Sequence, residues 1–458
     1  MKKYSNVMNT NVTWIPQIPA HWKLQKINAL FTERKKKVSD KDYKPLSVTK
    51  KGILPQLAHA AKSNDSDNRK LVKAGDFVIN SRSDRKGSCG VSKLDGSVSL
   101  INIVLTPRDE LNSEYIHYLL RNYRFSEEYY RNGRGIVADL WTTRYSEMRT
   151  ILIPVPPRAE QDQIVRFLDW KVSEINRLIR IKKNQINGYR EYEKKVINDK
   201  VLYGLQEAPL RESGNYWVGK IPTNWKIIKL GKFCSFQNGI SESGNFFTSG
   251  TPFVGYSDVY RHLELPKYVK GVAKANEQQQ KIFSVRKGDI FFTRTSESIE
   301  EIGMAAVCKH TIKDAVFSGF LIRCRPRMPL INEDYMKYYL QIPAVRNHFS
   351  SMMNIVIRAS LGQNLLKQMP VVVPPLKEQK EIAEFLDAMH ERFLRLITTN
   401  EEEISMLEEL RSTLISDVVT GKIDVRNIPV PDYEHVDDMV ADGGEGNDEE
   451  PRIPGEED

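Results

Sequence analysis

The chain has 458 residues, enough for two or three hydrophobic cores of ordinary size, and its formal net charge is +9. The charge is unevenly distributed. Residues 431–458 contain twelve Asp or Glu and one Arg, a net charge of −11, so the remaining chain carries +20. This basic body predicts a polyanionic partner such as nucleic acid, and the acidic, Gly- and Pro-rich end is predicted to be disordered.

Composition also argues against several classes of protein. No stretch approaches the roughly 18 consecutive apolar residues of a membrane helix, and the first lysines are not followed by the apolar segment of a secretory signal. The eight histidines form no H-x-x-x-H pair, which argues against zinc. The cysteines lack C-x-x-C spacing and are typical of reduced thiols, so we expect a cytoplasmic protein. They are Cys89, Cys234, Cys308 and Cys324.

The first predicted globule spans about residues 11–153. Strand-like runs at 76–81 and 97–105 are separated by Gly, Asp and Asn turns, which favours a mixed α/β globule. It opens with a block that contains Trp14, Ile18, Pro19 and Trp22, and its two tryptophans could stack on bases. Because this block returns later in the chain, we interpret it as a structural clasp.

A long helix is predicted next. The segment VPPRAEQDQIVRFLDWKVSEINRLI runs from Val155 to Ile179, and its two prolines suit the start of a helix. Apolar residues continue at alternating steps of three and four, with Lys182 interrupting, so we expect a coiled-coil helix of roughly 40 residues that stops at Gly204. The seam residues are Ile164, Leu168, Ile175, Ile179 and Ile186.

The second half of the chain repeats this order. Trp217, Pro222 and Trp225 restate the clasp, and a second mixed globule spans about residues 213–372, with strand-like runs at 289–296 and 315–324. The segment VPPLKEQKEIAEFLDAMHERFLRLI then restates the helix from Val373 to Ile397. Its seam residues are Ile382, Leu386, Phe393, Ile397 and Ile404, with Asn400 interrupting and Gly421 as the stop.

Connectivity predicts that the two helices run in opposite directions. The first helix leads almost directly into the second globule, and the second helix begins where that globule ends, so antiparallel packing needs no long return. Lys182 and Asn400 fall near mid-helix, where they could meet and set the register, or could simply face solvent. The expected fold is mixed α+β, with two α/β globules, two long antiparallel coiled-coil helices and an internal pseudo-two-fold repeat.

A search for catalytic motifs returns little. Gly214 to Lys220 fits the G-x-x-x-x-G-K phosphate-loop spacing, but Ile221 replaces the metal-binding hydroxyl, so a packed Trp-Pro turn is the better interpretation. There is no G-x-G-x-x-G, and Val155-Pro156-Pro157 lacks the preceding Asn or Asp of an amino-methyltransferase loop. Scattered carboxylates leave a nuclease centre open.

Basic polar segments that follow strands are better candidates for DNA contact. Arginine can hold guanine through two hydrogen bonds, and Ser or Thr can reach phosphates. Arg82 and Arg294 are predicted to share a strand-end position in the two globules; the alternative is a solvated loop without contact. The full candidate set is Arg82, Ser83, Arg85, Lys86, Arg134, Arg294, Thr295, Ser296 and Arg358.

The W-(x)-x-x-I-P-x-x-W-K block and the P-P-x-x-E-Q-x-x-I-x-x-F-L-D block, each present twice, resemble the DNA specificity (S) subunit of type I restriction–modification systems. The resemblance covers about residues 11–425; the acidic tail after Val430 is outside the pattern. It implies target recognition domains at 1–154 and 206–372 and conserved spacer helices at 155–205 and 373–425. Composition, not the resemblance, predicts an acidic disordered tail at 426–458.

The resemblance also implies the function. Each globule would read one half of a bipartite site in double-stranded DNA, while the helix seams fix the gap and dock two methyltransferase (M) subunits, and restriction (R) subunits join the assembly. The chain itself would be non-catalytic and bind no cofactor or metal. S-adenosylmethionine, ATP and Mg²⁺ would belong to the partners. Two alternatives are an autonomous nucleic-acid enzyme with an unrecognised carboxylate site and a coiled-coil assembly protein without DNA.

Overall fold

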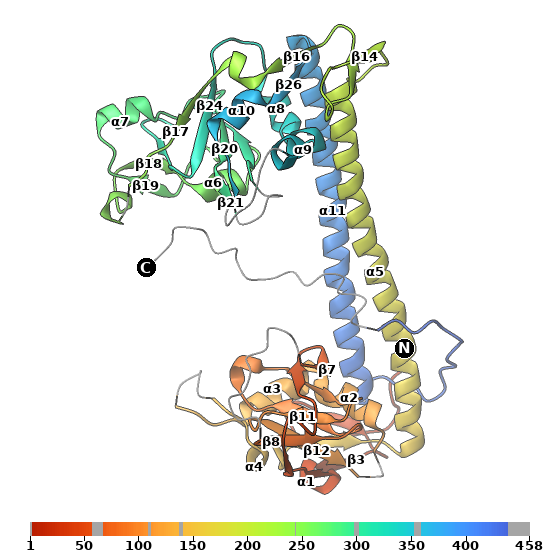
Figure 1. Cartoon of the computed structure of the whole chain (residues 1–458). Helices are drawn as coiled ribbons and strands as arrows, with labels where there is room; N and C mark the ends of the chain where they lie inside the picture. The colour runs from red at the N-terminus through yellow and green to blue at the C-terminus, as the bar shows by residue number, and fades with distance from the viewer. Residues whose placement is uncertain are drawn as a thin grey trace. The chain divides into compact units, whose positions relative to one another are not determined.

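A computed structural model of the chain describes residues 2–56, 67–108, 111–136, 141–242, 244–296, 302–351 and 359–437. These residues form two compact units, one of 2–185 with 399–437 and the other of 186–398 (Figure 1). Each unit contains one globule and part of each long helix. The unit boundaries therefore fall within the long helices, whereas the sequence predicted each helix as a segment of its own. Within the described ranges, no helix has the length and apolar character needed to cross a bilayer.

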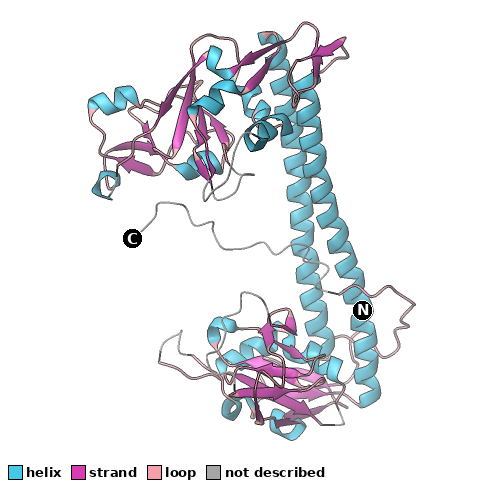
Figure 2. Ribbon diagram, in the orientation of Figure 1, coloured by secondary structure: helices cyan, strands magenta, loops and turns pink. Residues whose placement is uncertain are grey.

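The first globule is built on a four-stranded antiparallel sheet in the order β10-β9-β12-β4 (Figure 2). The central strand β9 (Phe77–Asn80) is flanked by β12 (Asn102–Pro107) and β10 (Cys89–Val91), and β4 (Phe31–Glu33) forms the edge. A smaller sheet has the order β11-β8-β5. The remaining elements are β1 (Val7–Asn9), β2 (Gln17–Pro19), β3 (Lys23–Lys26), α1 (Ile27–Leu30), β5 (Lys37–Val38), β6 (Leu46–Thr49), β7 (Gly52–Pro55), β8 (Arg69–Val72), η1 (Ser83–Arg85), β11 (Gly96–Val98), α2 (Ser113–Arg121), α3 (Tyr123–Arg131), α4 (Tyr145–Met148) and β13 (Leu152–Val155).

The second globule repeats the main sheet in the order β17-β24-β20-β22. Here β20 (Ile290–Thr293) takes the place of β9, between β24 (Leu321–Pro326) and β22 (Ala305–Val307). The remaining elements are β14 (Leu210–Glu212), β15 (Lys220–Pro222), β16 (Lys226–Lys229), η3 (Leu230–Lys232), β17 (Cys234–Asn238), η4 (Gly244–Phe247), β18 (Thr251–Val254), α6 (Tyr256–Tyr260), β19 (Gly271–Ala273), α7 (Glu277–Ile282), β21 (Thr295–Ser296), β23 (Val316–Phe317), α8 (Glu333–Tyr339), α9 (Pro343–Ser351), β25 (Ala359–Ser360), α10 (Gln363–Gln368) and β26 (Pro370–Val373).

A buried carboxylate fixes the turn before the central strand in both globules. Asp76 and Asp289 are each 1% exposed. Asp76 accepts two hydrogen bonds from Arg34 at 2.7 and 3.0 Å, and Asp289 accepts two from Arg325 at 2.6 and 2.7 Å. A buried carboxylate needs such a two-point partner to offset its loss of water. Arg34 directly follows the edge strand β4, whereas Arg325 lies within β24, so the globules keep the ion pair but not its sequence positions.

The long helices are α5 (Arg158–Tyr203) and α11 (Leu376–Val419), 46 and 44 residues against the roughly 40 expected. Both end where predicted, because Gly204 and Gly421 adopt positive φ angles of 83° and 76° that stop a helix without strain. In the first unit the start of α5 shares a core with the end of α11, and in the second unit the end of α5 shares a core with the start of α11. The helices therefore run in opposite directions, which confirms the predicted antiparallel pair and the mixed α+β class.

The predicted seam residues lie between these helices or against the globules. Ile397 and Ile404 are half-buried. The other eight are at most 9% exposed: Ile164, Leu168, Ile175, Ile179, Ile186, Ile382, Leu386 and Phe393. Buried side chains of this kind hold the helices together but cannot themselves contact another protein. Any docking surface on the helices must use the exposed residues beside the seam.

The polar interruptions are placed differently in the first unit. Lys182 Nζ lies 2.5 Å from Glu403 Oε2 on the other helix, and Asn400 is only 5% exposed. Lys182 is therefore paired with a carboxylate across the helix pair, and the expectation that Asn400 could face solvent is wrong.

The segment after α11 differs from the sequence expectation. Disorder was predicted from residue 426, but residues 426–437 are ordered against α5 in the first unit, and Val436 is 4% exposed. Asn176 Nδ2 donates a buried hydrogen bond of 3.0 Å to the Val436 carbonyl. The composition of the whole acidic end predicted disorder. Residues 426–437 are nevertheless held against α5 by a few apolar residues and by polar side chains of that helix.

Candidate nucleic-acid interface

Candidate DNA-contacting residues of the first unit meet at the end of β9. Arg82 and Arg134 lie far apart in the sequence, yet both form β-bridges with Thr142. Arg134 and Thr142 exchange two backbone hydrogen bonds of 2.9 Å, and Thr143 N donates to Ser81 O at 2.9 Å. The strand end is thereby tied into a short antiparallel ladder that carries two of the predicted arginines.

The charged side chains of this ladder are accessible. Arg82 is exposed, Arg134 is 84% exposed, and Arg85 is 68% exposed. Lys86 Nζ is paired with Glu127 Oε1 at 2.7 Å. Surface pairs of this kind contribute about 0–1 kcal/mol, so exchanging the carboxylate for a DNA phosphate costs little.

A small cavity of about 20 Å³ lies behind this loop. That volume holds about one water molecule, so the cavity is too small to hold a DNA base that has been flipped out of the duplex. The cavity is lined by aromatic and polar residues that include Arg82, Ser83, Lys86, Tyr129, Tyr130, Trp141 and Thr143.

The second unit builds a related ladder after β20. The strands β21 and β25 pair antiparallel, and Leu361 N donates to Arg294 O at 2.7 Å. This places Arg294 and Thr295 at the ladder, both half-exposed. Ser296 lies in β21, but its side chain is outside the described residues, as is the whole of Arg358.

The backbone register corrects one expectation. The bond from Thr143 to Ser81 in the first ladder corresponds to the bond from Leu361 to Arg294 in the second. Arg294 therefore stands at the position of Ser81, and Arg82 corresponds to Thr295. Neighbouring residues of an extended chain present opposite faces, so the prediction that the two arginines share a position is wrong by one residue. The sequence comparison missed this because both stretches mix Arg with Ser or Thr.

The repeated sequence blocks form the joint between each globule and the long helix that follows it. Trp22 Nε1 donates to Glu160 Oε1 at 3.0 Å, and Trp225 Nε1 donates to Glu378 Oε2 at 2.7 Å. The Trp-Pro clasp is thus confirmed as structural for these two tryptophans, each 2% exposed.

The repeated glutamine at the start of each long helix holds the N-cap residue of a globule helix. Gln161 Oε1 accepts from Asn112 N at 2.8 Å, and Gln379 Oε1 accepts from Asn332 N at 2.7 Å. Asn112 is the N-cap of α2, and Asn332 is the N-cap of α8. Each asparagine side chain accepts hydrogen bonds from the first backbone amides of its helix. The motif P-P-x-x-E-Q therefore locks the orientation of each helix relative to the globule that precedes it.

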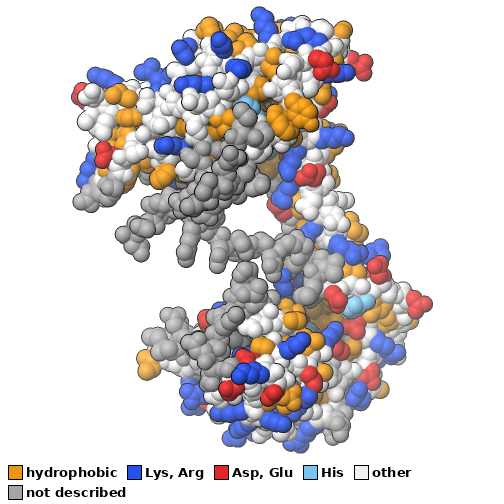
Figure 3. Space-filling model, in the orientation of Figure 1, with side chains coloured by type: hydrophobic (Ala, Val, Ile, Leu, Met, Phe, Trp, Pro, Cys, Tyr) orange, Lys and Arg blue, Asp and Glu red, His pale blue; other side chains and the backbone are white. Residues whose placement is uncertain are grey.

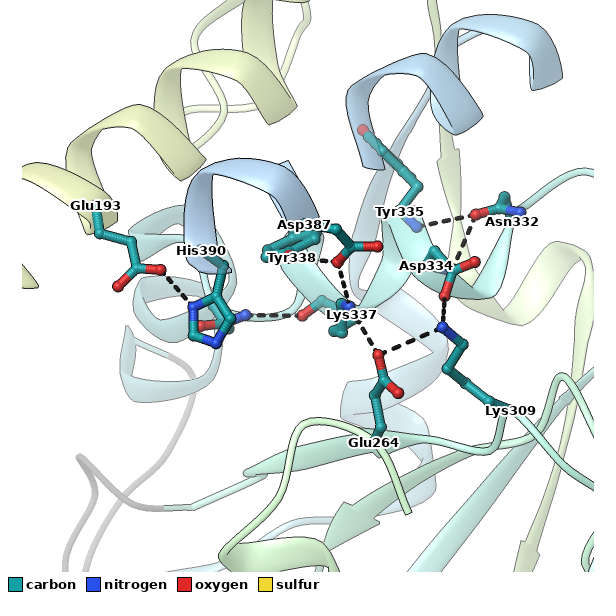
Figure 4. Close-up of polar contacts among 11 residues, drawn as sticks. Glu193, Glu264, Lys309, Asn332, Asp334, Tyr335, Lys337, Tyr338, Asp387 and His390 are labelled. Carbon is teal, nitrogen blue, oxygen red and sulfur yellow. Dashed lines mark hydrogen bonds and ion pairs between the residues drawn. The ribbon is translucent and has the colours of Figure 1, made fainter. Parts of the chain in front are cut away.

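The aspartate of the F-L-D motif completes the joint. Tyr118 OH donates to Asp169 at 2.8 Å, and Tyr338 OH donates to Asp387 at 2.6 Å. In the second unit Lys337 adds a bond of 2.6 Å to Asp387 (Figure 4).

The pKa values of these two aspartates are consequently shifted in opposite directions. Burial raises the pKa of Asp169, and the hydrogen bond from Tyr118 offsets this only in part. Burial also acts to raise the pKa of Asp387, but hydrogen bonds from Lys337 and Tyr338 outweigh it, so that pKa lies below its ordinary value.

Figure 4 shows how Lys337 links the helix to the second globule. Its Nζ is 2.6 Å from Asp387 and 2.7 Å from Glu264, and the side chain is 9% exposed. Lys309 extends the network by pairing with Asp334 at 2.8 Å. Two carboxylates around a buried ammonium compensate its desolvation. The network is structural, and within the described ranges no His, Cys, Asp or Glu group has the arrangement of a metal site.

One tryptophan departs from the clasp prediction. Trp217 is 37% exposed, whereas its counterpart Trp14 is 6% exposed. Trp14 packs edge-on against Phe125 at 5.7 Å, and the matching position of the second globule holds the smaller Val345. Trp217 packs instead against the exposed Tyr216 at 4.9 Å.

The Tyr–Asp contacts were missed at the sequence level although a signal existed. The segments NSEYIHY at 112–118 and NEDYMKY at 332–338 are a third repeated block, which gives each α2 or α8 helix two tyrosines in the same places. Tyr115 OH and Tyr335 OH reach the carbonyls of Pro154 and Val372, respectively, at 3.0 and 3.2 Å.

Comparison with known proteins agrees with this architecture. Residues 222–406 match the family model of the type I restriction modification DNA specificity domain. The putative type I restriction enzyme MjaX specificity subunit of Methanocaldococcus jannaschii is 22% identical over 336 residues, 71% of each chain. The type I restriction enzyme EcoKI specificity subunit of Escherichia coli K12 is 24% identical over 295 residues, 61% of this chain and 59% of that one.

Solved structures share the fold. One, from work on complex assembly and conformational transition of the type I R-M system, has a TM-score of 0.66 and 15% identity, and the match covers 89% of this chain and 99% of that one. The HsdS subunit from Thermoanaerobacter tengcongensis has a TM-score of 0.50 and 18% identity, covering 89% and 98%. The chain therefore shares the fold of these structures, and its residues 222–406 are similar to the type I DNA specificity domain.

Proposed function

We propose that this chain is the DNA-recognition subunit of a type I restriction–modification complex. Each unit reads one half of a bipartite double-stranded DNA site, and the helix pair sets the distance between the halves. The chain performs no chemistry itself. S-adenosylmethionine, ATP and Mg²⁺ are used by methyltransferase and restriction subunits that assemble on it.

The observation that carries this proposal is that each unit contains the same joint together with a basic ladder. The joints use the same bonds in both units, from Trp22 to Glu160 and from Trp225 to Glu378. The ladders keep the same register but differ in length and in charged residues. The same joint thus holds two different polar ladders, which suits the reading of two different half-sites.

The charge distribution supports a DNA partner. Outside the acidic end the chain carries +20, and Lys and Arg side chains are spread over the visible face of each unit (Figure 3). Such a surface supplies sequence-independent affinity that falls steeply with salt, while the ladders supply the selectivity.

Half-site mutagenesis tests the proposal. Arg82→Ala should weaken reading of one half-site, by roughly tenfold if one base contact is lost, and leave the preference at the other half-site intact. Arg294→Ala should affect only the other half. The measurement is binding of the full chain to DNA libraries randomised at one half-site at a time.

Lys23→Ala and Lys226→Ala are matched controls, because these exposed lysines occupy equivalent joint strands, β3 and β16. They remove one charge each and should lower affinity without changing sequence preference. Equal loss of preference at both half-sites for any single variant would contradict independent modules. Methylation or cleavage of DNA by the purified chain alone would contradict a non-catalytic role.

A further inference from the structure

A tight turn occurs at the same place in both globules, beside the ladder. In the first unit it spans residues 99–102, where Asn102 N donates to Ser99 O at 3.0 Å. In the second unit it spans residues 318–321, where Leu321 N donates to Ser318 O at 2.9 Å. Each turn leads into the strand that pairs with the central strand of the main sheet, β12 with β9 and β24 with β20. The two turns are therefore copies of one element.

The third residue of each turn is a large apolar side chain that remains accessible. Ile101 is 38% exposed and Phe320 is 43% exposed. The second residue is not copied, since Leu100 corresponds to Gly319. One exposed apolar residue is ordinary in a folded protein. An exposed apolar residue at the same turn position in both globules indicates a role that both globules share.

The backbone places these two side chains at the ladder. Ser81 N donates to Ile101 O at 3.4 Å, and Arg294 N donates to Phe320 O at 2.8 Å. Both bonds extend the pairing of the central strand by one residue. Residues that lie directly opposite one another in antiparallel strands project from the same face, with Cβ atoms about 5 Å apart. Phe320 therefore stands beside Arg294, and Ile101 stands beside Ser81, the residue before Arg82.

The turns are braced, so the direction of each apolar side chain is fixed. Ser318 Oγ accepts a hydrogen bond from Phe320 N at 3.2 Å, and Gly319 N donates to Ile240 O at 2.7 Å. In the first unit the Asn102 side chain adds a bond of 3.1 Å to the carbonyl that its backbone amide already contacts. A contact that discriminates between bases needs a side chain held in this way.

The chemistry of the tip defines what these side chains can recognise. Under the proposed function the ladder arginines read base edges in the major groove of DNA. The apolar group that bases present there is the 5-methyl group of thymine, which cytosine lacks. More than half of the surface of Ile101 and of Phe320 is covered by the globule. Such a side chain can cover a methyl group, but too little of it projects to enter the base stack as a wedge.

We propose that Ile101 and Phe320 each contact the 5-methyl group of a thymine, one in each half-site. This inference rests on the proposed function and extends it from the polar ladders to an apolar contact beside them. In the second unit the thymine is adjacent to the base read by Arg294, because the two side chains project from one face. Thymine is thereby part of both recognised half-sites.

Replacement of thymine by deoxyuridine removes only this methyl group and tests the inference. The probe is the duplex that the full wild-type chain selects from a randomised library, with each thymine replaced in turn. One replacement in each half-site should weaken binding about threefold to fivefold, the effect of leaving one methyl group in water. Phe320→Ala should remove this sensitivity in one half-site only, and Ile101→Ala in the other. Phe320→Leu, which keeps an apolar side chain, should retain it.

Leu94→Ala and Met328→Ala are matched controls that should leave the sensitivity to deoxyuridine unchanged. Leu94 is 38% exposed in the first unit and Met328 is 46% exposed in the second. Leu94 precedes β11 and Met328 follows β24, whereas the turns lie at the opposite ends of these strands. Sensitivity that persists in the unaltered half-site shows that a variant is folded.

The outcomes separate this inference from the proposed function. Equal weakening by Phe320→Ala on thymine and deoxyuridine duplexes would overturn the methyl contact, as would selected half-sites that contain no thymine or tolerate every replacement. In each of these cases sequence-specific binding itself remains, so the proposed function stands. Absence of any sequence preference in the wild-type chain would overturn both.

Discussion

At the scale of single residues, each joint depends on one carboxylate that the two units use to different extents. Glu160 is 6% exposed and accepts from Tyr4 at 2.6 Å and Trp22 at 3.0 Å, with His21 at 2.7 Å. Glu378 accepts from Trp225 at 2.7 Å, with Asn224 more weakly placed at 3.3 Å. The carboxylate of the first joint therefore has more hydrogen-bonding partners than that of the second.

Glu160→Ala should lower the free energy of unfolding more than Glu378→Ala does. Removing a buried acceptor strands its donors, which costs about 2–3 kcal/mol for Glu160 and about 1–2 kcal/mol for Glu378. Urea unfolding followed by tryptophan fluorescence gives both values. Glu381→Ala, at an exposed glutamate of α11, should change the midpoint little, and a larger effect at Glu378 than at Glu160 would refute the ranking.

The two copied aspartates predict opposite responses to pH. The pKa of Asp387 is lowered in the folded chain, so its contribution to stability is present near neutral pH and is lost as the pH falls through that pKa, below about 4. The pKa of Asp169 is raised, so its charged form costs stability at neutral pH, and that cost disappears as the pH falls through its pKa.

Asp387→Asn should therefore destabilise the chain by about 1 kcal/mol at pH 7, with the difference shrinking toward pH 3, where the wild-type carboxyl is also protonated. Asp169→Asn should be neutral or stabilising at pH 7. Thermal unfolding of both variants and the wild-type chain between pH 3 and 8 measures this. Two parallel curves would show that the aspartates titrate alike, contrary to the structure.

At the scale of elements, the glycines that end the long helices also close the joints. A Cβ on Gly421 would lie 2.3 Å from Pro19 Cδ, and a Cβ on Gly204 would lie 3.2 Å from the Trp225 ring. Gly188, in the middle of α5, has nothing within 4 Å of an added Cβ.

Gly421→Ala should thus be the most destabilising of the three alanine substitutions, because it adds a steric overlap to the roughly 1–2 kcal/mol cost of a left-handed alanine. Gly204→Ala should cost about that backbone term, and Gly188→Ala should stabilise by about 0.5–1 kcal/mol through higher helix propensity. Denaturant midpoints measured on the full chain should follow that order, and stabilisation by Gly421→Ala would contradict the joint.

The elements also show how far sequence reasoning reaches. Helix starts, helix stops and the antiparallel direction were predictable, because the Pro-Pro pairs, Gly204, Gly421 and the short connections are local signals. The exposure of Trp217 was not, because it depends on which partner that residue meets across the globule. The offset of Arg294 was overlooked although the sequence contains it, since Arg82 lies six residues after Asp76 and Arg294 lies five after Asp289. The order of residues 426–437 was missed because the α5 residues that hold this segment lie more than 250 positions earlier.

At the scale of the whole molecule, the continuous helices α5 and α11 are the only described elements shared by both units. Under the proposed function their length sets which half-site spacing the chain accepts. One added heptad lengthens a helix by about 10 Å, which corresponds to about 3 base pairs and turns the DNA face by about 100°.

Inserting one heptad in both helices, after Gln185 and after Thr398, should therefore abolish simultaneous binding to the two half-sites at the native gap. Each half-site should still bind its own unit with unchanged sequence preference, and only the gain from linking the two sites should disappear. Three heptads add about 32 Å, nearly one DNA turn of about 34 Å, so binding should return on targets whose gap is about 9 or 10 base pairs longer. Selection from a library of gap lengths reads this out. Recovery at the native gap with any insert would mean that the helices do not measure the distance.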